Sequence, residues 1–207
     1  ESCPAVEAQS AKGSSRMLRI ILIRPGTTDY VDQARVHGNL DIPLNEQGEE
    51  EVAKTAEALR DQNIRAVFCS DAEPALSTAK TLAAALDVKV RKLDHMQNLD
   101  HGLWQGMSVE EIKRKHPKVY RQWQEHPDSV CPPAGESLSD ARARVHGVLK
   151  KLLKKQKDGT IALVVSEPLT SLVRSDLQQC ELGDLWKAYT APGGWQVIET
   201  EMVPAAP

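Results

Sequence analysis

The sequence is poor in three features that assign many proteins to a class at once. Its four cysteines, Cys3, Cys69, Cys131 and Cys180, form no CxxC pair, which argues against a zinc site or a disulfide framework and predicts free thiols in a reducing compartment. No apolar run reaches the ~18 residues that a membrane-spanning helix requires. The 26 basic and 29 acidic residues leave a net charge of −3, so the overall charge favours neither nucleic acid nor a membrane as a partner. We therefore expect a cytoplasmic protein.

The length of the chain fits one domain rather than several. Its 207 residues are enough to bury a sizeable hydrophobic core, and they contain neither an internal repeat nor an evident linker. Residues 1–16 are small and polar and lack the apolar centre of a secretory signal. We expect residues 1–16 to form a flexible leader and residues 17–207 to form a single domain.

Apolar runs and helical periodicities alternate along that domain. The apolar runs predict β-strands at residues 18–23, 64–69, 88–93, 161–165 and 195–202. Apolar residues at helical spacing predict helices at residues 45–61, 75–86, 108–124 and 139–157. Such alternation is typical of an α/β protein, and we expect a three-layer α/β/α fold with a mainly parallel sheet. A ligand site is then expected at the carboxyl ends of the strands.

Six segments carry a resemblance to a known family. In chain order they read IRPGTT, RVHGNLDIPLNEQG, CSDAEPALSTA, LDHGLWQG, PPAGES and VVSEPLTSL. The family patterns R-x-x-G-x-x-D-x-P-L-T-x-x-G, G-x-W-E-G and P-G-G-E-S are met at Arg35, Gly38, Asp41, Pro43, Leu44, Gly48, Gly102, Trp104, Gly106, Gly135, Glu136 and Ser137. From residue 17 to the C-terminus the chain resembles the histidine phosphatase superfamily. The resemblance implies the phosphoglycerate-mutase-like fold.

The resemblance also implies a chemistry for which this chain lacks most of the residues. Members of the family transfer or hydrolyse phosphate through a phosphohistidine, with a second histidine and two arginines around the phosphate and a glutamate as general acid. At the positions of the first arginine and the nucleophile, this chain has Arg24 and Pro25. At the positions of the second arginine, the general acid and the second histidine, it has Pro74, Asn98 and Glu167.

Four of these five catalytic positions have therefore changed. Removing a single member of a catalytic unit can lower turnover by roughly 10⁴ to 10⁶. The joint change predicts a catalytically inactive pseudophosphatase with a binding, scaffolding or regulatory role. A second copy of the chain, as a homodimer, or another protein would be its partner.

The changed residues also predict a different charge in the former phosphate site. Glu167 would face Arg24, and at ~4 Å and an effective dielectric constant near 20 the two charges attract by about 4 kcal/mol before desolvation. We expect an ion pair that neutralises the site and leaves phosphate binding weak or absent. The remaining pocket is expected to be lined by Arg24, Thr27, Arg35, Asn98 and Glu167.

Two other functions remain open. The chain could be an active phosphoester hydrolase that uses non-standard residues, with Glu167 as a general base or with His37 or His101 in place of the missing nucleophile. We expect both histidines to be surface or packing residues instead. It could also be a sensor that binds a non-phosphate small molecule in the reshaped cleft. Neither a cofactor nor a metal ion is expected, because the histidines form no ligand spacing.

Two further features have simple structural explanations. Cys69 ends a predicted strand, where nucleophiles do occur, but no histidine is matched to it, and we expect a buried structural thiol. The basic run KKLLKKQK at residues 150–157 could bind nucleic acid or an acidic protein. Such a run is more often the solvated face of a helix, and we expect no nucleic-acid partner.

Overall fold

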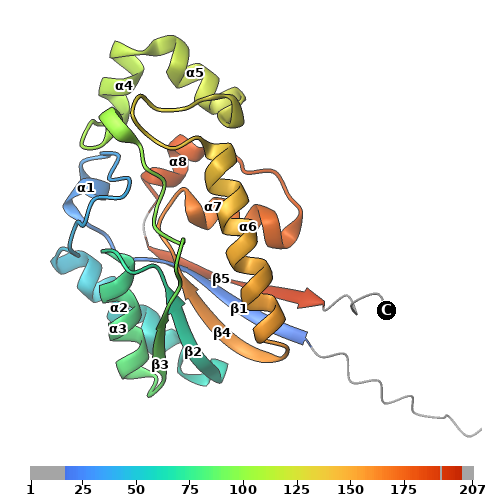
Figure 1. Cartoon of the computed structure of the whole chain (residues 1–207). Helices are drawn as coiled ribbons and strands as arrows, with labels where there is room; N and C mark the ends of the chain where they lie inside the picture. The colour runs from blue at the N-terminus through green and yellow to red at the C-terminus, as the bar shows by residue number, and fades with distance from the viewer. Residues whose placement is uncertain (1–16, 192, 202–207) are drawn as a thin grey trace, which may run out of the picture.

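The computed structural model describes residues 17–191 and 193–201 of the chain. The expected leader at residues 1–16, and the end of the expected domain at residues 202–207, lie outside the described residues. A five-stranded sheet forms the centre of the molecule (Figure 1). Its strands are β1 (Met17–Arg24), β2 (Ile64–Cys69), β3 (Lys89–Lys92), β4 (Gly159–Val164) and β5 (Gly194–Glu201).

The sheet has the spatial order β3-β2-β4-β1-β5. The pairs β2–β3, β2–β4 and β1–β4 are parallel, and only the β1–β5 pair is antiparallel among these strands. The predicted mainly parallel sheet is therefore confirmed. Because β1, β2 and β4 run side by side in the same direction, their carboxyl ends meet at one edge of the sheet.

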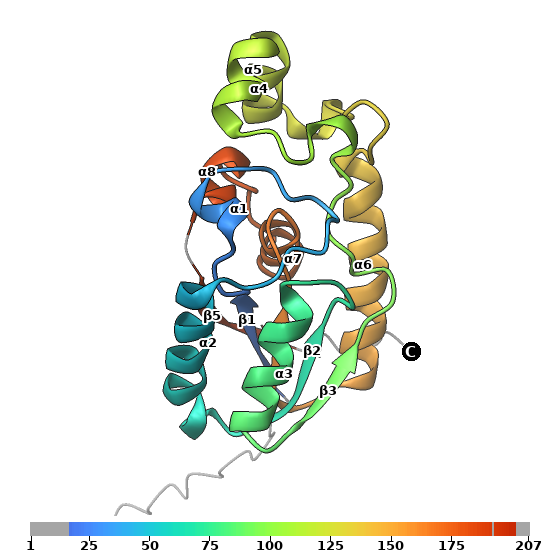
Figure 2. The same ribbon diagram turned by 90° about the vertical axis from the view of Figure 1, so that its left-hand side faces the viewer.

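Helices cover both faces of the sheet (Figure 1, Figure 2). They are α1 (Asp29–Asp32), α2 (Glu46–Ala58), α3 (Ala75–Ala85), α4 (Val109–Lys115), α5 (Pro117–Glu125), α6 (Leu138–Lys155), α7 (Leu169–Gln178) and α8 (Leu185–Tyr189), with 3₁₀ turns at Arg60–Gln62, Gly102–Trp104 and Pro127–Ser129. α2 and α3 pack on one face, and α6 and α7 pack on the other. The three-layer α/β/α prediction is thus confirmed. Within the described ranges, no helix has the length and apolar character needed to cross a membrane.

The larger of the two hydrophobic cores contains an aromatic cluster beyond the strand ends. The indoles of Trp104 and Trp123 contact the buried imidazole of His101, and both also contact the indole of Trp186. The His101 and Tyr189 rings meet edge to face with centroids 5.3 Å apart. Contacts of this kind add stability beyond the buried area itself. The cluster joins α5 and α8 to the 3₁₀ turn at Gly102–Trp104, and it packs these elements together beyond the carboxyl ends of the strands.

The structure differs from the sequence-based expectation in two helical regions. The helix expected at residues 108–124 is divided into α4 and α5 at His116, because Pro117 donates no backbone hydrogen bond and disfavours a helical conformation in the residue before it. The helices α7 and α8 were not predicted. α7 begins directly after Pro168, where Leu169, Leu172 and Val173 provide a short buried face.

Candidate active site

A small cavity lies where the carboxyl ends of β1, β2 and β4 meet. It has a volume of about 30 Å³, and we refer to it as the strand-end cavity. It is lined by Arg24, Pro25, Gly26, Val31, His37, Pro74, Ser166, Glu167, Ala188, Tyr189 and Ala191. Since one water needs at least about 10–15 Å³ of such volume, there is room for about two water molecules.

The structure brings most of the family's catalytic positions together. Arg24, Pro25, Pro74 and Glu167 all line the strand-end cavity. Asn98 lies next to them, because its side-chain amide donates to the carbonyl of Glu167 at 2.9 Å and to the carbonyl of Gly38 at 2.9 Å. The five positions that the sequence resemblance identified therefore form one site, with Asn98 bound to its wall.

Two residues expected in the pocket do not line this cavity. Thr27 is buried and turned away from it, and its backbone N–H and hydroxyl donate to Glu51 Oε2 at 3.0 Å and 2.8 Å. The Arg35 guanidinium donates to the carbonyl of Gly106 at 2.5 Å and lies 3.9 Å from Glu111. Both side chains hold neighbouring loops in place rather than facing the cavity.

The predicted ion pair between Arg24 and Glu167 is not formed. None of the ion pairs within residues 17–191 and 193–201 joins the two, although both line the same cavity. Glu167 Oε2 instead accepts hydrogen bonds from the backbone N–H of Ser171 at 3.2 Å and from its hydroxyl at 2.8 Å. Arg24 lies over Gly194 of β5 and also lines a second cavity of about 110 Å³ that it shares with Arg174.

The carboxylate of Glu167 is thus used as a helix cap, and the same arrangement recurs beside β2. Glu73 accepts from the backbone N–H of Ser77 at 3.1 Å and from its hydroxyl at 2.8 Å. In both cases the sequence reads Glu-Pro-x-x-Ser, and the proline at the N-cap position has no side chain that could accept a hydrogen bond. The glutamate before the proline supplies the missing acceptor for α3 or α7.

A third carboxylate closes the turn after β1. In addition to its hydrogen bonds with Thr27, Glu51 accepts from the backbone N–H of Gly193 and from the Gln47 amide. Partial burial opposes ionisation, but these hydrogen bonds hold the pKa of Glu51 below its usual value. The roles of Glu51 and Glu73 were not predicted from the sequence. The repeated Glu-Pro-x-x-Ser pattern was the signal that could have revealed Glu73.

Burial has the opposite effect on Glu167. It raises the pKa of this carboxyl group above the usual value, although the hydrogen bonds from Ser171 and the charges of Arg24 and Arg174 act against the rise. The cavity therefore disfavours additional negative charge. An incoming anion would meet the carboxylate of Glu167, which lines the cavity and already accepts from the backbone N–H of Ser171.

His37 is the imidazole that lines the strand-end cavity within the described part of the chain. It is 6% exposed, its Nδ1 has no hydrogen-bond partner, and burial lowers its pKa to about 4 despite a backbone hydrogen bond at Gly38. Of the surface or packing roles expected for His37 and His101, the structure shows buried positions for both. Behind His37, His101 is fully buried, shares a hydrogen bond with Tyr189, and has its pKa lowered to about 3 by burial and by His37.

The remaining nucleophile candidate is unreactive. Cys69 is fully buried at the end of β2, and burial raises the pKa of its thiol to about 11. Since the thiolate is the reactive form, a thiol with this pKa is a structural group at neutral pH. Across the described ranges, no group of three or more His, Cys, Asp or Glu side chains is placed to bind a metal ion.

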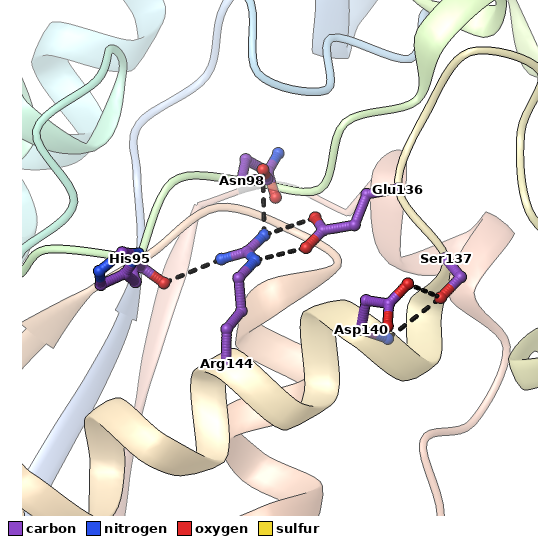
Figure 3. Close-up of polar contacts among 6 residues, drawn as sticks. All are labelled: His95, Asn98, Glu136, Ser137, Asp140 and Arg144. Atoms are coloured by element: carbon purple, nitrogen blue, oxygen red, sulfur yellow. Dashed lines mark hydrogen bonds and ion pairs between the residues drawn. The ribbon is translucent and has the colours of Figure 1, made fainter.

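The segment that presents Asn98 is fixed by a partly buried ion pair (Figure 3). The Arg144 guanidinium binds the Glu136 carboxylate through two contacts of 2.6 Å and 2.8 Å. It also donates to the carbonyls of His95 at 2.9 Å and Asn98 at 3.3 Å. Arg144 on α6 therefore positions residues 95–98 from below, and it leaves the Asn98 amide pointing toward the strand-end cavity.

Comparisons with known proteins agree with this architecture. The model of the "Histidine phosphatase superfamily (branch 1)" matches residues 20–202. Phosphoserine phosphatase 1 of Hydrogenobacter thermophilus is 29% identical over 185 residues, which cover 89% of this chain and 88% of that protein. Glucosyl-3-phosphoglycerate phosphatase of Mycobacterium tuberculosis is 29% identical over 143 residues, or 69% of this chain and 64% of the relative. A solved structure of the mycobacterial glucosyl-3-phosphoglycerate phosphatase in complex with VO3 superposes with a TM-score of 0.75 at 25% identity, covering 86% of this chain and 90% of that one.

Proposed function

Because the chain belongs to the histidine phosphatase superfamily (branch 1), we propose that it is a member that has lost phosphohistidine transfer and has a binding, scaffolding or regulatory role. The observation that carries this proposal is that carboxylates of the protein itself take up the backbone N–H groups after the strands, and that one of them, Glu167, lines the strand-end cavity. The carboxylates of Glu51, Glu73 and Glu167 accept hydrogen bonds from backbone N–H groups that follow β1, β2 and β4. In an anion site, such N–H groups would point at the ligand.

The site also lacks a competent nucleophile. Pro25 has no group that could attack phosphorus or carry a phosphoryl group, and it stands where the family has its reactive histidine. The cationic part of the cradle is weakened as well, since Pro74 replaces an arginine and Arg24 lies over Gly194. Few groups remain that could bind and neutralise a transferred phosphoryl group.

The volume of the cavity favours a protein partner over a small molecule. About 30 Å³ admits about two waters, so a metabolite would have to widen the cavity before binding. A partner protein, or a second copy of this chain, needs only the rim around the strand ends. We therefore place the binding role at this rim rather than inside the cavity.

A second candidate is an active phosphoester hydrolase, and two observations favour it. The relatives above carry the names of phosphatases. His37 lines the same cavity as Arg24, and its lowered pKa keeps the imidazole in the neutral form that a nucleophile or general base requires. In this alternative His37 replaces the missing histidine, and Arg24 binds the phosphoryl oxygens.

Turnover measurements separate the two candidates. The native chain, the His37→Gln variant and a quadruple variant that restores the family residues (Pro25→His, Pro74→Arg, Asn98→Glu, Glu167→His) are assayed with para-nitrophenyl phosphate and phosphoserine. We expect no turnover by the native chain above a buffer control. Hydrolysis by the native chain that disappears in His37→Gln would establish the hydrolase and overturn the first proposal.

Binding of inorganic phosphate tests the role of the capping carboxylates directly. By isothermal titration calorimetry, we expect no saturable binding to the native chain at millimolar phosphate, and measurable binding after Glu73→Gln and Glu167→Gln together. A matched control is Glu46→Gln with Glu125→Gln, since both residues are exposed and the change in net charge is the same. Equal phosphate binding by the two double variants would show that net charge, rather than the two capping carboxylates, excludes the anion.

A further inference from the structure

A basic groove lies away from the strand-end cavity, between β3 and the C-terminal half of α6. We call it the β3–α6 groove, and its volume is about 390 Å³. It is lined by Phe68, Arg91, Lys92, Leu93, Asp94, His95, Val148, Lys151, Leu152, Lys155 and Gln156. Four of these side chains are cations, and they come from two elements that are far apart in the sequence.

The spacing of residues on α6 explains one wall of the groove. Val148, Lys151, Leu152 and Lys155 follow one another at intervals of three or four residues, so they share one face of the helix. Leu152 is buried in the core and anchors this face against the sheet. The lysine pair therefore stands at the rim of the groove, above an apolar base.

The edge position of β3 explains the other wall. β3 is paired only with β2 among the described strands, and Arg91 is in register with Phe68 of β2. The Arg91 guanidinium lies over the Phe68 ring, with 6.0 Å between the guanidinium carbon and the ring centroid. This cation–π contact holds the charge of Arg91 over an apolar residue that also lines the groove.

The four cations of the groove are not paired with acidic side chains of the described part of the chain. None of Arg91, Lys92, Lys151 and Lys155 takes part in an ion pair within residues 17–191 and 193–201, whereas eleven other basic side chains, including the imidazole of His146, form such pairs. Asp94 is the one acidic residue that lines the groove. The groove thus concentrates uncompensated positive charge in a chain whose net charge is −3.

We propose that the β3–α6 groove binds a compact polyphosphate: a linear inorganic polyphosphate or the polyphosphate group of a soluble organic molecule. Four cations around one hollow suit a ligand that carries three or more negative charges within a few bonds of one another. Lysine and arginine form charge-assisted hydrogen bonds with phosphate oxygens, and the exposed face of the Arg91 guanidinium offers a flat surface for an attached ring. The site is independent of the proposed loss of catalysis.

The shape of the groove favours this ligand class over a charged macromolecule. In an extended acidic peptide, successive residues are ~3.3–3.6 Å apart and alternate between two sides, so few carboxylates would face one hollow. A nucleic acid strand needs a basic track that follows its backbone, whereas these cations surround one volume. Hexaglutamate and a single-stranded oligonucleotide therefore serve as competing ligands in the test.

The experiment uses tripolyphosphate as the probe and two matched double variants of α6. Lys151→Gln with Lys155→Gln removes two charges from the groove, and Lys150→Gln with Lys154→Gln removes two charges from exposed positions of the same helix that do not line the groove. Circular dichroism and thermal unfolding verify that both variants are folded. Isothermal titration calorimetry at low and at physiological salt measures the affinity.

We expect tripolyphosphate to bind the native chain, to bind about as well to the Lys150/Lys154 variant, and to bind at least about tenfold more weakly to the Lys151/Lys155 variant. Arg91→Gln should weaken binding in the same direction. Equal losses in the two double variants would overturn the proposal, as would the absence of binding to the native chain. Tighter binding of hexaglutamate or of the oligonucleotide than of tripolyphosphate would overturn it in favour of a macromolecular partner.

Discussion

Replacing the buried imidazole of His37 should make the protein more resistant to acid. His37 lines the strand-end cavity together with Arg24, Glu167 and Tyr189, and burial lowers its pKa from 6.5 to about 4. In the unfolded chain the imidazole takes up a proton near pH 6.5, whereas the folded chain resists this until about pH 4. The free energy of unfolding that depends on neutral His37 is therefore fully present above pH 6.5 and is lost as the pH falls through this window.

The size of this effect follows from the two pKa values. At about 1.4 kcal/mol for each pH unit, the interval between 6.5 and about 4 corresponds to about 3 kcal/mol. Urea unfolding at pH 7.5, 6.5, 5.5 and 4.5 measures it in the native chain and in His37→Gln. We expect similar stability at pH 7.5 and a shallower decline in the variant, because glutamine has no proton to gain.

The comparison also controls for the other groups that titrate in acid. His101 and the carboxyl groups are present in both proteins, so the difference between the two pH profiles reports on His37 together with its effect on the pKa of His101. His126→Gln removes an exposed imidazole and should leave the profile unchanged. If His37→Gln lost stability with falling pH as steeply as the native chain, His37 would not be held neutral by burial. The alternative hydrolase, in which neutral His37 replaces the missing histidine, would then lose its support as well.

Two further predictions test the packing around the site. Gly48→Ala should lower the free energy of unfolding by about 3 kcal/mol, because the added Cβ on α2 would lie 2.0 Å from the carbonyl oxygen of Thr27. Gly147→Ala in α6 should instead raise the free energy of unfolding by about 1 kcal/mol, because its Cβ meets nothing within 4 Å. A loss of stability in Gly147→Ala would contradict the helical position of Gly147. Arg144→Gln should cost about 3 kcal/mol, because it leaves the Glu136 carboxylate, 22% exposed, without its partner. The exposed pair of Arg142 provides the control, where Arg142→Gln should change stability by less than about 1 kcal/mol in the same urea titration.

The strands and the outline of the site were predictable because their signals are local. The apolar runs that became β1, β2 and β4 are buried on both faces of a parallel sheet, so nothing else competes with their strand pattern. The break between α4 and α5 was also encoded, in Pro117, and should have been anticipated. The short helix α7 was overlooked, although Leu169, Leu172 and Val173 show its periodicity.

The pairing of Arg24 with Glu167 failed as a prediction because it depended on a contact between distant segments. Ser171 lies four residues after Glu167 and offers two hydrogen-bond donors at the start of a helix, so the local partner orders the carboxylate with little loss of chain entropy. The position of Arg24 over Gly194 depends on the register of β5 on β1, which brings together residues far apart in the sequence. No local sequence pattern predicts the register between β1 and β5.

The two Glu-Pro-x-x-Ser caps make the present state of the site hard to reverse by single substitutions. Changing Glu167 to the histidine of the family pattern would remove the acceptor for the Ser171 N–H, and changing Pro74 to an arginine would alter the backbone between Glu73 and Ser77. The loss of a helix cap lowers stability by about 1 kcal/mol, and neither substitution alone restores a nucleophile. If catalysis has been lost as proposed, each single substitution toward the family residues would therefore lower stability without restoring phosphoryl transfer, so the two caps help to preserve the present site.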